Sequence, residues 1–143
     1  MTVLNLNTSN EIAKNAFQHA TEVGAAPLTV AVLDQGGKLI ALQRQDGSSM
    51  LRPDVAIGKA WGALALGKSS REIGLDAENR PAFISALNTL AQGNLVPVPG
   101  GVLVMSEAGG EVLGAVGISG DTSDIDELCA IEGIRAAGLR CNA

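Results

Sequence analysis

Two pairs of β-rich segments, each joined by a turn with two adjacent glycines, constrain the fold of this chain most strongly. The first pair is LTVAVLD (28–34) and LIALQRQ (39–45), and the second is VLVMS (102–106) and VLGAVGI (112–118). Apolar and β-branched runs around such turns are typical of β-hairpins, in which neighbouring strands run antiparallel. The sequence therefore predicts two hairpins, and with them most of an antiparallel sheet.

Helices are predicted on both sides of these hairpins. Thr8 and Glu11 have the spacing of a capping box, with Thr8 as the N-cap and Glu11 as the third helical residue. Apolar residues then recur at helical spacing as far as Val23, and Gly24 can end the helix. A proline in the first turn, or a capping Ser or Thr, predicts three more helices, at about 53–66, 81–92 and 124–137.

The order helix, hairpin, helices, hairpin, helix decides the fold class. Neither hairpin belongs to a βαβ crossover, so we expect an α/β (α+β) fold with a mainly antiparallel sheet covered by helices. The 143 residues correspond to a single domain, 1–143. Eighteen glycines and only three aromatic residues imply a core of Val, Ile, Leu and Ala packed at close range. Gly114, Gly117 and Gly120 lie along one predicted strand and mark a close approach to it.

The net charge limits the kinds of binding partner to expect, and the cysteines indicate the redox state of the compartment. A formal net charge of −5 argues against a nucleic-acid partner. Seven of the ten basic residues lie between Lys38 and Arg80, where they either form a solvated surface or hold a small anion. With no run of about 18 apolar residues and no N-terminal signal pattern, we expect a soluble, cytoplasmic protein that does not contact membranes. Cys129 and Cys141 are expected as free thiols, and Cys129 is either reactive or a small buried hydrophobe.

Residues 62–69 (GALALGKS) match the P-loop pattern G-x-x-x-x-G-K-[ST], which cradles nucleotide phosphates. A P-loop follows a buried strand and leads into a helix. Here Pro53 opens a helix upstream, and Gly74 interrupts the segment in which the P-loop helix would continue. We therefore interpret the match as a coincidence. Gly58 and Gly62, one helical turn apart, indicate instead that a neighbouring backbone or a flat ligand comes close.

Acidic residues near the last helix and the single histidine are the remaining chemical candidates. The segment 117–127 does not fit a calcium loop when its ligand positions are counted from Asp121, and its acids suit a helix N-terminus better. His19 borders the apolar stripe of the first helix. It is either a partly exposed residue with a hydrogen bond or an axial metal ligand that faces a pocket.

Four segments in a fixed order carry a family resemblance. They are VAVLDQGGKLIALQRQDG (30–47), PDVAIGKAWGALALGKSSRE (53–72), VPVPGGVLV (96–104) and GEVLGAVGISGDTSDIDELCA (110–130). Together they resemble the GlcG/HbpS-like family of haem-binding proteins, which includes the C-terminal domain of PduO-type proteins. The resemblance implies a profilin-like, three-layer α/β/α fold with an antiparallel sheet of about five strands flanked by helices, and a homo-oligomer.

The resemblance also implies a non-covalent haem site. His19 would be the axial ligand of the haem iron, because it lies on the first helix, where some members carry a haem-ligating histidine. Basic side chains would pair with the haem propionates, and glycines would let the flat ring approach. These further cofactor-binding residues are Arg52, Lys59, Lys68, Arg71, Gly58 and Gly62. Few aromatic rings and no C-x-x-C-H motif indicate a weakly bound, exchangeable haem.

We therefore expect a haem-binding accessory protein that acts in haem storage, haem transfer or redox sensing. Two alternatives stay open. One is a small-molecule enzyme with tautomerase-type or hydratase-type chemistry, in a glycine-lined pocket between the long helix at 53–66 and the strand at 112–120. Its acid or base would be Asp121, Glu127 or Lys59. The other alternative is an oligomeric scaffold without a ligand.

Overall fold

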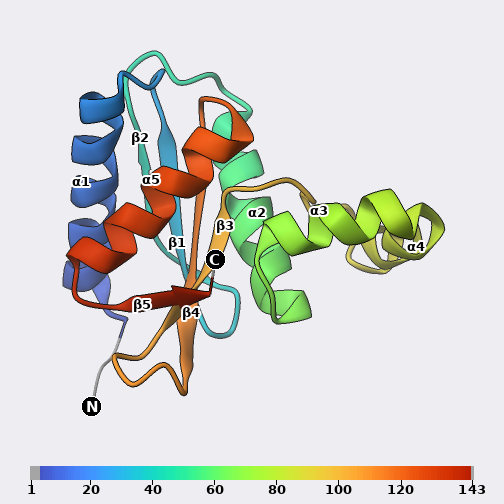
Figure 1. Cartoon of the computed structure of the whole chain (residues 1–143). Coiled ribbons are helices and arrows are strands. Elements are labelled where there is room, and N and C mark those ends of the chain that lie inside the picture. Colours follow the sequence, from blue (N-terminus) through green and yellow to red (C-terminus); the bar gives the residue numbers. More distant parts are fainter. Residues whose placement is uncertain (1–3, 143) are drawn as a thin grey trace.

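A computed structural model describes residues 4–142 as three layers built around one five-stranded sheet (Figure 1). The spatial order of the strands is β2-β1-β4-β3-β5, and every neighbouring pair runs antiparallel. The strands are β1 (Thr29–Asp34), β2 (Leu39–Arg44), β3 (Gly101–Met105), β4 (Val112–Ser119) and β5 (Arg140–Asn142). The predicted fold class, an antiparallel sheet flanked by helices, is confirmed.

The helices divide between the two faces of the sheet and an arm that projects from it (Figure 1). They are α1 (Leu6–Val23), α2 (Arg52–Leu66), α3 (Ser70–Asn79), α4 (Pro81–Leu90) and α5 (Ser123–Ala136). The α1 and α5 helices pack against each other on one face, and α2 lies across β1, β4 and β3 on the other. The α3 and α4 helices form the arm, in which α4 packs against α3.

Both predicted hairpins form, with the turns that the glycines indicated. In the first hairpin the Asp34 carboxylate accepts hydrogen bonds from the backbone N–H groups of Gly36 and Lys38. Gly37 has φ +79°, a conformation that a side chain would strain. The β3 and β4 strands pair in the second hairpin, and the short β5 strand, which the sequence analysis did not predict, adds to the free edge of β3.

The structure differs from the sequence predictions at one helix cap and contains one helix that was not predicted. The N-cap of α1 is Asn5, whose side chain accepts from the backbone N–H of Thr8, so the prediction of Thr8 as the cap was wrong. Gly24 does end this helix, at φ +69°. The α3 helix was not predicted, because Gly74 near its middle lowers helix propensity. That glycine is required by packing: a Cβ there would come 2.8 Å from the carbonyl oxygen of Pro97.

Glycines let α2 lie directly on the sheet. A Cβ at Gly117 would overlap the carbonyl oxygen of Ala56, and one at Gly101 would overlap the carbonyl oxygen of Lys59. On the opposite side of the helix, a Cβ at Gly58 would come 2.5 Å from the side chain of Val96. The close approach predicted at Gly58 and Gly117 is confirmed, and Gly101 is a further such position; the group that approaches each of them is this chain's own backbone or side chain.

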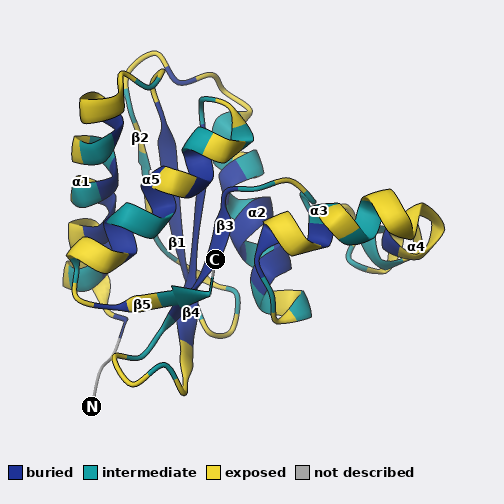
Figure 2. Cartoon of the chain, in the orientation of Figure 1, coloured by how far each residue is buried: buried dark blue, intermediate teal, exposed yellow. Residues whose placement is uncertain are grey.

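Side chains alternate along the strands between two apolar clusters, one on each face of the sheet. Val30, Val32 and Val116 face α1 and α5, whereas Leu33 and Ala115 face α2. Figure 2 shows β1, β3, β4 and the inner sides of these three helices as largely buried, while the edge strands β2 and β5 are partly exposed and most of the arm is exposed. The core is therefore built from small aliphatic residues, as the composition predicted.

The P-loop-like string has no P-loop geometry. Residues 62–66 are the end of α2, Gly67 is its C-cap, and Ser69 caps the start of α3. The string joins two helices, in agreement with the interpretation of the match as a coincidence. Between residues 4 and 142, none of the helices combines the length and the apolar character that a membrane crossing needs.

Candidate functional site

His19 lies on the side of α1 that borders α5, at the edge where the two helices meet solvent. Its side chain is 23% exposed, and its Nδ1 atom is 3.6 Å from Oε2 of Glu22, one helical turn further along. Its Nε2 atom is buried and has no hydrogen-bond partner among the residues that the structure describes. A buried ring nitrogen without a partner is rare in folded proteins and calls for a ligand or a water molecule.

The hollow beside His19 is small and acidic. It has a volume of about 170 Å³, well below the ~300–1,000 Å³ that is usual for cofactor sites. The α1 and α5 helices both contribute to its lining, which consists of Asn15, Gln18, His19, Glu22, Glu132 and Ala136. No lysine or arginine is among these side chains, so apart from His19 itself the hollow offers no basic partner for a carboxylate.

The basic residues expected to bind propionates lie elsewhere, and each has a partner. Arg52 and Lys59 belong to α2, on the opposite face of the sheet from α1. The Arg52 guanidinium donates to Oγ of Ser119 at 3.1 Å, and Lys68 forms an ion pair with Asp76. Within one chain the structure therefore does not bring these side chains to His19.

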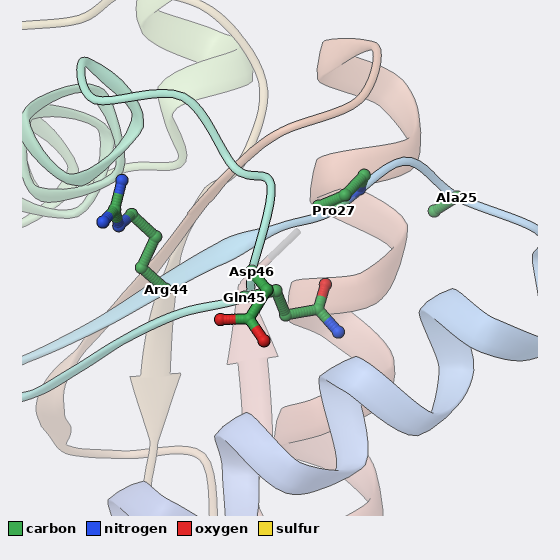
Figure 3. A pocket seen from close by; sticks show the side chains of 5 residues that line it. All are labelled: Ala25, Pro27, Arg44, Gln45 and Asp46. Carbon is green, nitrogen blue, oxygen red and sulfur yellow. The ribbon is translucent and has the colours of Figure 1, made fainter.

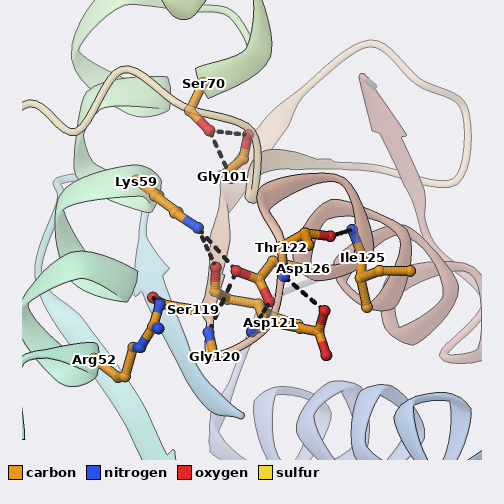
Figure 4. A network of polar contacts seen from close by, with 11 residues as sticks. Arg52, Lys59, Ser70, Gly101, Ser119, Gly120, Asp121, Thr122, Ile125 and Asp126 are labelled. Carbon is orange, nitrogen blue, oxygen red and sulfur yellow. Dashed lines mark hydrogen bonds and ion pairs between the residues drawn. The ribbon is translucent and has the colours of Figure 1, made fainter. Parts of the chain in front are cut away.

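Lys59 is the centre of a buried polar network at the junction of α2, β4 and α5 (Figure 4). Its side chain is only 2% exposed, and its ammonium donates to the Ile118 carbonyl oxygen at 2.9 Å and to Oδ2 of Asp126 at 3.2 Å. The Asp126 carboxylate, 1% exposed, also accepts from the backbone N–H groups of Gly120 and Asp121. Every oxygen of this carboxylate thus has a donor.

Burial dominates the electrostatics of this pair. Removal from water lowers the pKa of Lys59 against the opposing attraction of Asp126, and it raises the pKa of Asp126 against the attraction of Lys59 and the backbone donors. Lys59 lines neither of the two hollows that border α2. The geometry identifies Lys59 as a structural tie between α2 and the start of α5.

The other acid and base candidates are also engaged. The Glu127 carboxylate receives the Arg71 guanidinium at 3.0 Å, and Asp124 pairs with the same guanidinium, which ties α3 to α5. Hydrogen bonds from the backbone N–H groups of Ala26 and Thr122 lower the pKa of Asp121, which keeps this carboxyl ionised. These contacts fix loops and helix ends, which is a structural role.

The glycine-lined pocket expected between α2 and β4 does not exist, because the backbone of α2 fills that space over Gly117. A different hollow, of about 550 Å³, lies beside β2 (Figure 3). There the Gln45 side chain is occupied by the backbone N–H of Leu28, and the Arg44 guanidinium donates to the Ser48 carbonyl oxygen. In Figure 3 the Arg44 side chain points away from Asp46. The polar side chains of this open hollow therefore do not converge on one point.

Sequence reasoning missed the partners of the two candidates that matter most. Asp126 lies 67 residues from Lys59, and no local pattern links them. Burial of Lys59 did have a signal: Ala56, Lys59 and Ala63 recur at helical spacing on the face that packs on the sheet. Glu22 had a signal too, since it follows His19 by three residues on the same helix.

Metal ions have no multidentate site in the described part of the chain. Residues 4–142 contain no group of three or more His, Cys, Asp or Glu side chains that could hold an ion. His19 is therefore a single potential ligand, which suits a metal that is already held by another set of donors.

Comparison with known proteins gives the family context. The model of the family described as haem degrading protein HbpS-like matches residues 4–135. An uncharacterised protein from the dhaT–dhaS intergenic region of Citrobacter freundii is 32% identical over 127 residues, which cover 89% of this chain and 87% of that protein.

Solved structures share the fold over nearly the whole chain. Protein ORFY of Klebsiella pneumoniae has a TM-score of 0.83 and 28% identity, covering 95% of this chain and 93% of its own. The structure of PduOC in complex with haem has a TM-score of 0.85 and 23% identity, covering 96% of this chain and 97% of its own. The second likeness shows a shared fold, in a protein that was solved with haem bound.

Proposed function

This chain belongs to the HbpS-like family of haem degrading proteins, and from that premise we propose that it binds haem non-covalently, with His19 as the axial ligand of the iron. The observation that carries the proposal is the buried Nε2 atom of His19, which has no partner among residues 4–142. A neutral imidazole nitrogen with a free lone pair is the donor that haem iron takes from histidine.

The contact between His19 and Glu22 supports the same assignment. A histidine that ligates a metal usually directs its other ring nitrogen at a carboxylate or a carbonyl, which fixes the tautomer and the ring orientation. The Glu22 carboxylate lies on the Nδ1 side of the ring, 3.6 Å away. A proton on Nδ1 leaves the lone pair on Nε2, so Glu22 is a positioning residue for the proposed ligand.

The size of the hollow beside His19 supports weak, exchangeable binding. A volume of about 170 Å³ leaves most of a haem outside, and neighbouring side chains must move before iron reaches the buried nitrogen. Bound haem supplies one-electron redox chemistry, whereas the chain supplies the imidazole and the carboxylate behind it. The roles that suit such a site are storage, transfer or redox sensing of haem.

Contacts of the propionates with basic residues stay a prediction. Arg52, Lys59, Lys68 and Arg71 already have protein partners, and Arg52 and Lys59 lie on the α2 face of the sheet. A second copy of the chain would have to bring such a cation, or the glycines of α2, to a haem on His19. Lys59 is the least suited of the four, because it is only 2% exposed.

We further propose a homo-oligomer in the cytoplasm. Two free cysteines, Cys129 and Cys141, suit a reducing compartment. The arm supports the oligomer: of the ten residues of α4, only Ile84 is buried, although the helix is mostly apolar. Two short helices bury little apolar surface by themselves, which favours a further surface that covers the exposed side of the arm.

A hemin titration of the purified protein tests the haem proposal. Wild-type protein should give a saturable change in the Soret band at one haem per chain, and His19→Ala should lose or shift it. Gln18→Ala is the matched control, because Gln18 lines the same hollow without being able to ligate iron. Binding that is indifferent to His19, or equally weakened by both variants, would overturn the assignment of His19.

A further inference from the structure

A groove along α2 has the features of a second binding site, on the face of the sheet opposite His19. It has a volume of about 240 Å³. One wall is α2, and the other is the segment that returns from α4 to β3 (Figure 1). Its lining consists of Asp54, Ile57, Gly58, Trp61, Gly93, Asn94 and Val96. The four residues from α2 recur at helical spacing, so they follow one another along one face of the helix.

Asp54 gives the groove a negative end. Its carboxylate is exposed in the first turn of α2 and has no hydrogen bond or ion pair with another residue in the part of the chain described, 4–142. The nearest basic residue in sequence, Arg52, is directed at Ser119 instead. None of the residues that line the groove is basic. The charge of the groove therefore favours a cation over an anion.

Trp61 gives the groove an apolar, electron-rich end. It follows Asp54 by seven residues, about 10 Å along a helix axis. The hairpin turn covers part of its ring, since a Cβ at Gly37 would come 3.2 Å from its Cδ1 and Nε1 atoms. The ring also borders a second hollow on the side of Leu64, so it is packed incompletely on two sides. An indole face attracts both alkyl groups and cations.

We propose that this groove binds a small alkylammonium compound, with the ammonium group at Asp54 and the alkyl chain lying over Ile57 towards Trp61. The carboxylate forms a charge-assisted hydrogen bond with the ammonium, and the aliphatic and indole surfaces remove the alkyl chain from water. The volume limits the ligand to a small molecule. This proposal is independent of haem binding, because the groove and His19 lie on opposite faces of the sheet.

The single tryptophan makes the test specific for the site, since all indole fluorescence comes from Trp61. The protein is titrated with hexylammonium, with the neutral analogue hexanol and with the anion hexanoate, while the fluorescence is recorded. We expect a saturable change with hexylammonium at a concentration about tenfold lower than with hexanol, and no saturable change with hexanoate.

Two variants separate the charge of Asp54 from its place on the helix. Asp54→Asn should weaken hexylammonium binding about tenfold and leave the response to hexanol unchanged. Glu72→Gln is the matched control, because Glu72 is also an acidic residue in the first turn of its helix but does not line the groove. His19→Ala should bind hexylammonium like the wild type. Equal responses to all three compounds, or a hexylammonium response that is unchanged in Asp54→Asn, would overturn the proposal.

Discussion

Lys59 and Asp126 show how a single residue pair fixes the geometry of this protein. The ammonium and the carboxylate are almost fully buried, and the network that they form joins α2, β4 and α5. Each charge is tolerated only because the other is present, since an unpaired buried ion costs several kcal/mol. Burial penalises both charged forms, so the intact pair adds little net stability even though the loss of one partner is costly.

Removing one partner of the pair should therefore cost far more than removing a similar ion pair on the surface. We expect Lys59→Met to lower the free energy of unfolding by about 3–5 kcal/mol, because Asp126 is left buried without a counter-ion. Lys68→Met is the control: Lys68 and Asp76 are each about a third exposed, so the loss should stay below about 1 kcal/mol. Urea denaturation measures both values, and equal losses would contradict the structural role of Lys59.

Burial shields Cys129 from reagents, and it makes the free energy of unfolding decrease as the pH rises into the alkaline range. This residue is fully buried, and burial raises the pKa of its thiol from 9.0 to about 11. The unfolded chain then loses this proton first as the pH rises. The stability that the neutral thiol contributes is complete below pH 9 and is lost as the pH rises to about 11.

The expected loss across this pH window is about 2–3 kcal/mol. Denaturation curves of wild-type protein and Cys129→Ala, measured at several pH values, check it. The alkaline decline should be shallower in the variant, whereas Cys141→Ala should keep most of it, because Cys141 is only partly buried. Parallel declines in wild type and Cys129→Ala would show that Cys129 is not its source.

At the scale of elements, the contact between α2 and the sheet depends on glycines in β3 and β4. Gly117 and Gly101 lie beneath the backbone of α2, where no side chain fits. The helix therefore rests on the strands at backbone distance, which also explains why the core needs no large aromatic side chains. The same contact leaves no room for a ligand between α2 and β4.

Gly117→Ala should push α2 away from the sheet, because its Cβ would overlap the carbonyl oxygen of Ala56. We expect the free energy of unfolding to fall by about 1–3 kcal/mol, the usual range for overpacking. Gly110→Ala is the matched control, since a Cβ at Gly110 would meet nothing within 4 Å. Thermal unfolding of both variants decides the matter: a shared, small shift in Tm would argue against a tight contact.

At the scale of the whole molecule, the arm of α3 and α4 is the part that a single chain explains least. It extends away from the three layers, and much of it is exposed (Figure 2). Several large apolar side chains of the arm and of the segment that follows it face solvent: Leu75, Phe83, Leu90 and Val98. Such a surface suits a contact between copies of the chain.

Leu90→Glu should shift the protein from the proposed oligomer towards the monomer, because a charge would be buried at the contact. The monomer itself should keep its stability, since Leu90 is 81% exposed. Light scattering coupled to size-exclusion chromatography measures the mass. Val112→Glu, at an exposed residue at the start of β4, is the control and should keep the wild-type mass. A mass that is unchanged in Leu90→Glu would exclude the arm as the contact.

The sequence by itself determined the local elements. Turn glycines, first-turn prolines, a capping-box pattern and a capping Ser or Thr predicted both hairpins and four of the five helices, because these signals act within a few residues. The α3 helix escaped prediction because tertiary packing outweighs the low propensity of Gly74, and β5 is too short to leave a pattern. The position of His19 at the border of its apolar stripe was also readable from helical spacing alone.

Only the tertiary structure decided which candidate residues share a site. It placed His19 and the cations of α2 on opposite faces of the sheet, and it joined Lys59 to Asp126 across 67 residues. It also set Trp61 and Asp54 against the segment that follows α4. The physical reason is that hydrogen bonds of turns and caps are local, whereas burial and ion pairing depend on which surfaces meet when the sheet is covered.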